Sequence, residues 1–274
     1  MDDIKLPLIL KENPVTKQDW KYYLSFESPF DYIDEIRNGL KQANRYFVDI
    51  RFRKLFFWLL TNPMAVNYFQ QYIYSTTEAP HTIFYRARIY NPGDPIGQEP
   101  NFRGYDKAGS FVPPEKIISP AGRINPDGIK YLYTASDIAT AIAEVNPHIG
   151  NKISVAKITI KQPLHIFNIA INDCGIDVPH FPAASDWLQK FVLGLSLTFQ
   201  QPYSQNGNYY LCQYISEFVK LWGFDGICHY SSKINADDKD CIGKNYIIFN
   251  TDKCEPISSE LHHIADMKID FFHM

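Results

Sequence analysis

The chain lacks any arrangement of cysteine or histidine that would hold a disulfide framework or a metal ion. Its five cysteines are odd in number and scattered, and none of them forms a Cys-x-x-Cys pair. The histidines are scattered too, and His262-His263 near the C-terminus has no partners at metal-ligand spacing. We therefore predict no metal site and interpret the cysteines as reduced thiols: Cys174, Cys212, Cys228, Cys241 and Cys254.

Further absences exclude whole classes of protein. No run approaches the roughly 20 apolar residues that cross a bilayer, and the charged start of the chain is unlike a signal peptide. A Gly-x-Gly-x-x-Gly motif and a Walker loop are both absent, so neither a Rossmann nor a P-loop nucleotide site is supported. The net charge of −3, from 27 basic and 30 acidic residues, is too balanced to favour a nucleic-acid or membrane surface. We expect a cytoplasmic protein with a small-molecule or protein partner, without direct nucleic-acid binding and without membrane attachment.

The 274 residues are 45% hydrophobic and 15% aromatic, which is enough to bury a sizeable core. From about residue 15 to residue 74 the apolar side chains recur three or four apart, which predicts helices. A polar break with a proline follows at 75–81, so we predict an N-terminal helical module over residues 1–81. Its basic residues are interpreted as solvated helix faces, with nucleic-acid binding as the less favoured alternative: Arg37, Lys41, Arg45, Arg51, Arg53 and Lys54.

From Thr82 the pattern changes to a period of two, which predicts a strand that carries two arginines on one face. A loop rich in proline and glycine follows over 91–122, and loops of this length are usually lids or binding loops. One strand face holds Ile83, Tyr85, Ala87 and Ile89, and the other holds Phe84, Arg86, Arg88 and Tyr90.

Strands and helices alternate irregularly over the rest of the chain, so the predicted fold class is α+β. A strand at 129–133 leads into a helix at 139–145, which Ser136 or Asp137 caps and Pro147 ends. The other predicted elements are strands at 153–160, 164–167, 226–230 and 246–249, and a helix at 209–222.

Two arginines and one glutamate are candidates for chemistry. Arg123 lies in a loop whose Pro-Asp-Gly end predicts a turn, and a guanidinium held on a turn suits bidentate binding of a diphosphate. Arg86 could do the same, although either residue alone is more often a surface or salt-bridging residue. Glu144 lies near the end of an apolar helix, where the macrodipole disfavours a carboxylate. A basic partner or a functional role would explain it, and a solvent-facing glutamate is equally open.

Tyr133 and Ser231 are further candidates. Tyr133 could stack on a planar ring, although a half-buried strand tyrosine is the commoner case. Ser231 ends a predicted strand without a Gly-x-Ser-x-Gly elbow or a companion base, so we interpret it as a ligand-binding hydroxyl. His229 shares its face and is interpreted as structural.

In their order along the chain, these segments resemble the RES domain family, named for its arginine, glutamate and serine. Phe84-Tyr-Arg86 resembles the opening strand of the family, and Gly122–Gly128 resembles its Gly-Arg-Trp-Asn-x-x-Gly loop, with Ile124 in place of tryptophan. Leu132-Tyr133 and Thr140–Val145 resemble the tyrosine strand and the glutamate helix. Gln213, and the segment from Gly223 to Ser231, resemble the glutamine helix and the serine strand. The resemblance covers residues 82–250 as the catalytic domain, and 251–274 remain as a C-terminal extension.

The resemblance implies an ADP-ribosyltransferase-like fold, with a mixed β core, and an activity on NAD+. It also implies the toxin of a bacterial toxin–antitoxin pair whose antitoxin has an Xre-type DNA-binding domain. Arg86 and Arg123 would hold the pyrophosphate, with Asn125 also counted as a binding residue. Tyr133 would pack on the nicotinamide or its ribose, and Ser231 would orient the nicotinamide side. Glu144 would hydrogen-bond the ribose hydroxyls and stabilise the oxocarbenium-like transition state.

Several alternatives stay open at the level of sequence. Arg88 could replace Arg86, and Ser232 adjoins Ser231. The first hypothesis is an NAD+-degrading toxin that works by hydrolysis or by phosphorolysis, with inorganic phosphate as one candidate acceptor. The alternatives are a mono-ADP-ribosyltransferase that modifies a protein and a non-catalytic nucleotide-binding module. Residues 1–81 could bind an antitoxin, mediate homodimer formation or recognise a target.

Overall fold

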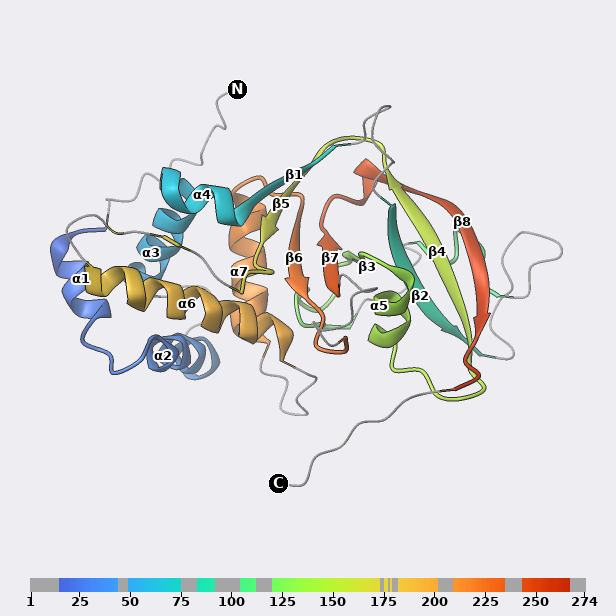
Figure 1. Ribbon diagram of the computed structural model, residues 1–274, viewed down its shortest axis with the longest axis horizontal. Helices are drawn as coiled ribbons and strands as arrows, with labels where there is room; N and C mark the ends of the chain where they lie inside the picture. Colours follow the sequence, from blue (N-terminus) through green and yellow to red (C-terminus); the bar gives the residue numbers. More distant parts are fainter. Residues whose placement is uncertain are drawn as a thin grey trace. The chain divides into compact units, whose positions relative to one another are not determined.

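A computed structural model describes residues 15–43, 49–74, 83–91, 104–111, 120–172, 175–176, 178, 182–201, 209–234 and 243–266. Over these residues the chain is an α+β protein with seven α-helices and eight β-strands (Figure 1). The chain divides into two compact units, which are treated one at a time. Unit 1 comprises Met1–Ile73, Pro120–Ile129 and Leu164–Ser232, and unit 2 comprises Tyr74–Ser119, Lys130–Pro163 and Lys233–Met274.

Four short helices open unit 1: α1 (Lys17–Tyr23), α2 (Pro29–Gln42), α3 (Ile50–Thr61) and α4 (Pro63–Phe69). Each begins where a polar side chain caps its first turn. Thr16 and Ser28 form capping boxes, and Asn62 caps α4 with Pro63 at the first helical position. The predicted helical character is thereby confirmed for the described residues as far as residue 69.

The predicted helix is wrong for the last part of that region. Residues Gln70–Ile73 form strand β1, which pairs antiparallel with β5 (Leu164–Asn168). Backbone hydrogen bonds to a distant strand outweigh the weak local preference for a helix here. In unit 1 the strand order is β1-β5-β6, and β6 (Gly226–Tyr230) runs parallel to β5.

The core of unit 1 is built largely from aromatic rings. The long helix α6 (Pro182–Gln200), which the sequence pattern did not predict, packs beside α2, while α7 (Tyr210–Leu221) confirms the helix predicted at 209–222 (Figure 1). The Trp187 ring stacks on Tyr23 at 5.7 Å and on Phe191 at 5.2 Å between ring centroids. Gly194 lets α2 approach α6, because a methyl group there would lie 2.6 Å from Cδ1 of Ile33.

Unit 2 contains five antiparallel strands in the order β7-β3-β2-β4-β8. They are β2 (Ile83–Tyr90), β3 (Leu132–Ala135), β4 (Lys152–Ile160), β7 (Lys244–Ile248) and β8 (Cys254–His263), with a 3₁₀ turn at Thr251–Lys253. Strand β8 was not predicted, and β3 lies slightly later than the predicted 129–133. The predicted alternation along β2 is confirmed, since Phe84 contacts Tyr246 while Ala87 packs beneath helix α5 (Ile138–Glu144).

Three cysteines lie in the described part of the chain, and all three are buried: Cys212, Cys228 and Cys254. Cys174 and Cys241 lie outside the described residues, as do the predicted boundary at 75–81 and most of the predicted loop at 91–122. Within the described ranges, none of the helices combines the length and the apolar character needed to cross a bilayer.

Candidate functional site

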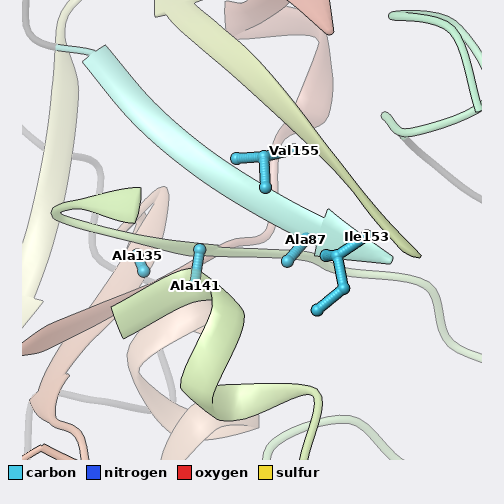
Figure 2. Close-up of a cluster of buried hydrophobic side chains, with 5 residues drawn as sticks. All are labelled: Ala87, Ala135, Ala141, Ile153 and Val155. Atoms are coloured by element: carbon cyan, nitrogen blue, oxygen red, sulfur yellow. The ribbon is translucent and has the colours of Figure 1, made fainter. Parts of the chain in front are cut away.

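Helix α5 carries Glu144 at its last position and lies on a small buried cluster of unit 2. Figure 2 shows this cluster between the helix and the strands, with Ala141 of α5 near Ala87 and Ala135 and with two side chains from β4: Ile153 and Val155. The alanines allow the helix to approach the strands closely because they have almost no side-chain volume. This packing fixes the position of the helix end from which Glu144 projects.

The N-terminus of α5 is fixed by Asp137, which confirms one of the two predicted caps. Asp137 accepts hydrogen bonds from the backbone N–H of Thr140 at 2.7 Å and from the hydroxyls of Thr140 and Ser136. Burial works to raise the pKa of Asp137, but these hydrogen bonds outweigh it and hold the pKa below its usual value. The helix ends at Glu144, with Val145 as its C-cap, and the next residue, Asn146, adopts a left-handed backbone conformation with φ of 50°.

The carboxylate of Glu144 is held by Asn245 of strand β7. Nδ2 of Asn245 donates a hydrogen bond to Oε1 of Glu144 at 2.6 Å. Glu144 is half-buried, and Asn245 is only 7% exposed. The strand register explains the contact, because Asn245 is paired with Ala135, directly next to the start of the segment that leads into α5.

Arg86 of β2 is half-buried, and part of its guanidinium lacks the partners that buried nitrogens of an arginine normally have. Its Nε and Nη1 atoms are shielded from solvent, and none of the described residues accepts a hydrogen bond from either atom. Burial, together with the positive charge of Arg88, lowers the pKa of Arg86 to about 10, while nearby Tyr133 acts in the opposite direction. Arg86 therefore stays charged at neutral pH and lies close to Tyr133. A buried cation with unused donors is a suitable site for an anionic group.

The pairing between β2 and β3 is limited at this point. Among the described residues the two strands pair at one position, Tyr85 with Ala135. Arg86 on β2 and Tyr133 on β3 both lie on the same side of this antiparallel pair, where no further pairing joins the described parts of the two strands. By the alternation along β2, Arg86 shares the face of Phe84, whereas Glu144 belongs to the α5 face.

The guanidinium of Arg88, the alternative to Arg86, already has partners within the protein. It lies 3.8 Å from the centroid of the Tyr105 ring, and its Nη1 donates to the carbonyl of Gly109. The described segment 104–111 is fastened further, because the Tyr105 N–H donates to Ser154 Oγ at 2.8 Å and Ser259 Oγ donates to the Tyr105 carbonyl at 2.8 Å. Arg88 thus anchors a loop segment, and Arg86 is the arginine of β2 that retains unused donors.

In unit 1, the arginine loop is shaped by its own side chains. The N–H of Ile129 donates to the Pro126 carbonyl, and Gly128 has φ of +79°, so the predicted turn is confirmed. Nδ2 of Asn125 donates to three carbonyls, those of Pro120, Pro126 and Ile129, at 3.0 to 3.1 Å. The amide nitrogen of Asn125 is therefore engaged in holding the loop.

Side chains of helix α7 also hold this loop through hydrogen bonds. Nε2 of Gln213 donates to the Gly122 carbonyl at 2.8 Å, and Ser216 Oγ donates to the Ile124 carbonyl at 2.7 Å. Ile124 is fully buried, so it makes a packing contact at the position where the family usually has tryptophan.

Arg123 projects from this loop to the C-terminal end of α6. Its Nη1 donates to the Phe199 carbonyl at 2.6 Å, which satisfies one of the carbonyls left over at the helix end. Its Nε is buried and has no acceptor among the described residues. One edge of the guanidinium is thus fixed, while another edge retains a donor of the kind that binds phosphate.

Ser231 follows directly after β6 and is 6% exposed, whereas the adjacent Ser232 is exposed. Its neighbour His229 is 3% exposed, with Nδ1 2.7 Å from the Tyr230 carbonyl. That environment agrees with the structural role predicted for His229.

The predicted site residues therefore form separate groups within their units. In unit 2 the structure brings Arg86 close to Tyr133, and it brings Glu144 into contact with Asn245. In unit 1, the arginine loop is joined to α6 and α7, and Ser231 lies at the end of β6. Asn245 and Ser216 were not predicted. A sequence signal for Asn245 is weak, because 101 residues separate it from Glu144.

Comparison with known protein families gives one match. Residues 85–268 match the model of the RES domain, which is more than half of the chain. The matched range includes β8, whose residues were expected from the sequence to form a C-terminal extension. A search of curated proteins and a search of solved structures each gave no match.

Proposed function

This chain belongs to the RES domain family, and from that premise we propose that it is an enzyme that cleaves NAD+ between nicotinamide and ribose. In this proposal the protein is a cytoplasmic NAD+-degrading toxin, and the acceptor of the ADP-ribosyl group is water or inorganic phosphate. NAD+ is a substrate and no metal takes part.

One observation carries the proposal more than any other, namely the buried guanidinium of Arg86 with donors that no described residue uses. A buried donor without an acceptor lowers the free energy of unfolding by about 1–3 kcal/mol, unless a bound ligand supplies the acceptor. The pyrophosphate of a dinucleotide supplies both the negative charge and the acceptor oxygens. The neighbouring Tyr133 offers a ring of the right kind to stack on nicotinamide or to line its ribose.

Glu144 supplies the electrostatic part of the reaction. When the C–N bond to nicotinamide breaks, the bonding electron pair leaves with nicotinamide and positive charge develops on the ribosyl carbon and the ring oxygen. A half-buried carboxylate beside that carbon stabilises this charge more in the transition state than in the substrate. Water or phosphate oxygen then bonds to the carbon, and a proton is released when water attacks.

Arg123, Asn125 and Ser231 of unit 1 enter the proposal through the family resemblance. The Nε donor of Arg123 suits a phosphate oxygen, and the buried Ser231 is a better candidate than the exposed Ser232. Asn125 is assigned the shaping of the loop, since its amide nitrogen is already bonded to three carbonyls.

The family resemblance also leads us to propose an Xre-type antitoxin as the partner. Expression of the chain should arrest bacterial growth and deplete cellular NAD+, and co-expression of a neighbouring helix-turn-helix protein should restore growth. Normal growth at full expression of the chain would contradict the toxin part of the proposal.

The enzymatic part is tested by incubating the purified chain with NAD+, with and without phosphate, and quantifying the products. Free nicotinamide with ADP-ribose indicates hydrolysis, and nicotinamide with ADP-ribose-1″-phosphate indicates phosphorolysis. A third arm adds cell lysate as a source of protein acceptors. Label that enters a protein band only in that arm supports the alternative of a mono-ADP-ribosyltransferase.

Three variants accompany this assay: Glu144→Gln and Arg86→Lys change proposed site residues, and Arg88→Lys is the control. Glu144→Gln keeps the shape of the side chain and removes its charge, so nicotinamide release should fall by about 10²-fold or more. Arg88→Lys changes the neighbouring arginine that anchors segment 104–111, and its activity should stay closer to that of the wild type than the activity of Arg86→Lys. If no nicotinamide appears in any arm, the chain is not an NAD+-cleaving enzyme and the binding-module alternative replaces the proposal.

A further inference from the structure

Strand β7 places a buried amide against the carboxylate on which the proposed reaction depends. Asn245 is 7% exposed and donates from Nδ2 to Oε1 of Glu144 at 2.6 Å, a short hydrogen bond to a carboxylate. Among the hydrogen bonds described, the side-chain amide of Asn245 donates to Glu144 alone. The amide therefore holds one oxygen of the Glu144 carboxylate in place.

The backbone on both sides of this contact is fixed. The N–H of Ser136 donates to the Lys244 carbonyl at 2.9 Å, and the Lys244 N–H donates to Ser136 Oγ at 3.1 Å. The same Ser136 hydroxyl donates to Asp137, the cap of α5. Asn245 thus projects from a strand that is fastened to the beginning of α5, and its side chain reaches the end of that helix.

We infer that Asn245 is a positioning residue for Glu144: its amide fixes Oε1 and thereby sets the rotation of the carboxylate toward the ribose. A glutamate at the end of a helix has three rotatable side-chain bonds, and each freely sampled rotamer reduces the fraction of molecules ready to react. This inference rests on the proposed function, and it adds a residue to which the RES motif positions of this chain assign no role.

The test compares Asn245→Ala and Asn245→Asp with the wild-type chain in the nicotinamide-release assay, with kcat and KM measured separately. Asn245→Asp retains the shape of the side chain but has no donor when ionised. We expect kcat to fall by about 10- to 100-fold in both variants while KM for NAD+ changes by less than about threefold, because a bond to Glu144 is lost and no bond to the substrate is. A rise in KM with unchanged kcat would contradict the positioning role and would indicate direct contact with the substrate.

A double-mutant cycle separates positioning from general damage to the fold. In the Glu144→Gln background, adding Asn245→Ala should change kcat by less than about threefold, since the group that Asn245 positions has already been altered. Equal losses in the two backgrounds would overturn the inference.

The matched control is Thr134→Val. Thr134 is buried on β3 and donates from Oγ1 to the Tyr246 carbonyl at 2.9 Å, so this change also removes a buried hydrogen bond between β3 and β7. It should lower the melting temperature and leave kcat within about twofold of the wild type, whereas Asn245→Ala should lower kcat far more. Wild-type activity in Asn245→Ala would overturn this inference alone, and absence of nicotinamide release by the wild type would overturn the proposed function itself.

Discussion

Arg86 has two buried guanidinium nitrogens for which none of the described residues supplies an acceptor. In an ordinary core the same position would hold an apolar side chain, because an unpartnered guanidinium destabilises the folded state. The lowered pKa of Arg86, about 10, expresses that cost. Since the pKa still lies well above neutrality, the charge is present at pH 7 and available to an anion.

Arg86→Met should therefore stabilise the ligand-free protein while abolishing nicotinamide release. The methionine side chain has a similar length and needs no hydrogen bonds, so the expected gain in the free energy of unfolding is about 1–3 kcal/mol. Chemical denaturation without NAD+ measures the gain. A less stable Arg86→Met chain would show that Arg86 has a structural role.

Arg88→Met provides the matched comparison on the same strand and the same face. Arg88 has partners, the Tyr105 ring and the Gly109 carbonyl, so its removal should lower stability. We expect the free energy of unfolding to rise in Arg86→Met and to fall in Arg88→Met. A change in the same direction in both variants would contradict the distinction drawn between these arginines.

At the scale of elements, α5 is the structural support of Glu144, and its cap is sensitive to pH. Hydrogen bonds hold the pKa of Asp137 below its usual value, so the stabilisation is fully present above the unfolded pKa of about 4. It is lost as the pH falls through the lower pKa of the folded state. Part of the stability of unit 2 should therefore disappear in acid.

Asp137→Ala should cost about 1 kcal/mol of stability at pH 7, the usual cost of a lost N-cap, and less near pH 3. Unfolding by urea at the two pH values measures the difference between wild type and variant. A difference that grows toward pH 3 would mean that the protonated form of Asp137 is the stabilising one, contrary to the lowered pKa of this carboxyl.

Elements with a strong local pattern were predictable from the sequence, and elements set by distant contacts were not. The period of two in β2 and the capped run of α5 depend on neighbouring residues, and both are confirmed. Strand β1 follows α4 without a break in the apolar pattern, so only its pairing with β5 distinguishes it from helix. Strand β8 alternates weakly, because it is an edge strand with exposed residues such as Ile257.

The candidate site shows the same division. The order of Arg86, Arg123, Glu144 and Ser231 along the chain was readable as a family motif. The sequence could not distinguish Arg86 from Arg88, because the difference depends on the contacts that segment 104–111 makes with the Arg88 guanidinium. The contact of Asn245 with Glu144 could not be predicted from the sequence either, since it forms only when β7 pairs with β3.

At the scale of the whole molecule, the N-terminal helices share a core with later parts of the chain. Phe56 of α3 lies 5.6 Å from Phe167 of β5, and Tyr23 of α1 stacks on Trp187 of α6. All of these residues belong to unit 1, although the family match begins only at residue 85. Unit 1 therefore needs its N-terminal helices to bury its aromatic core.

A chain that begins at residue 74 should accordingly fail to fold, although it retains the whole family match. We expect loss of cooperative thermal unfolding by circular dichroism, with exposed apolar surface detected by dye binding. A truncated chain that melts cooperatively near the wild-type temperature would show instead that residues 1–73 form a separable module.

The most direct test of the central claim is the amount of free nicotinamide released from NAD+ by the purified full-length chain, measured beside Glu144→Gln and Arg86→Met. We predict that the wild type converts NAD+ to stoichiometric nicotinamide and ADP-ribosyl product, and that both variants, though folded, release almost none. Intact NAD+ after incubation with the wild type, with phosphate and with lysate, would contradict the claim.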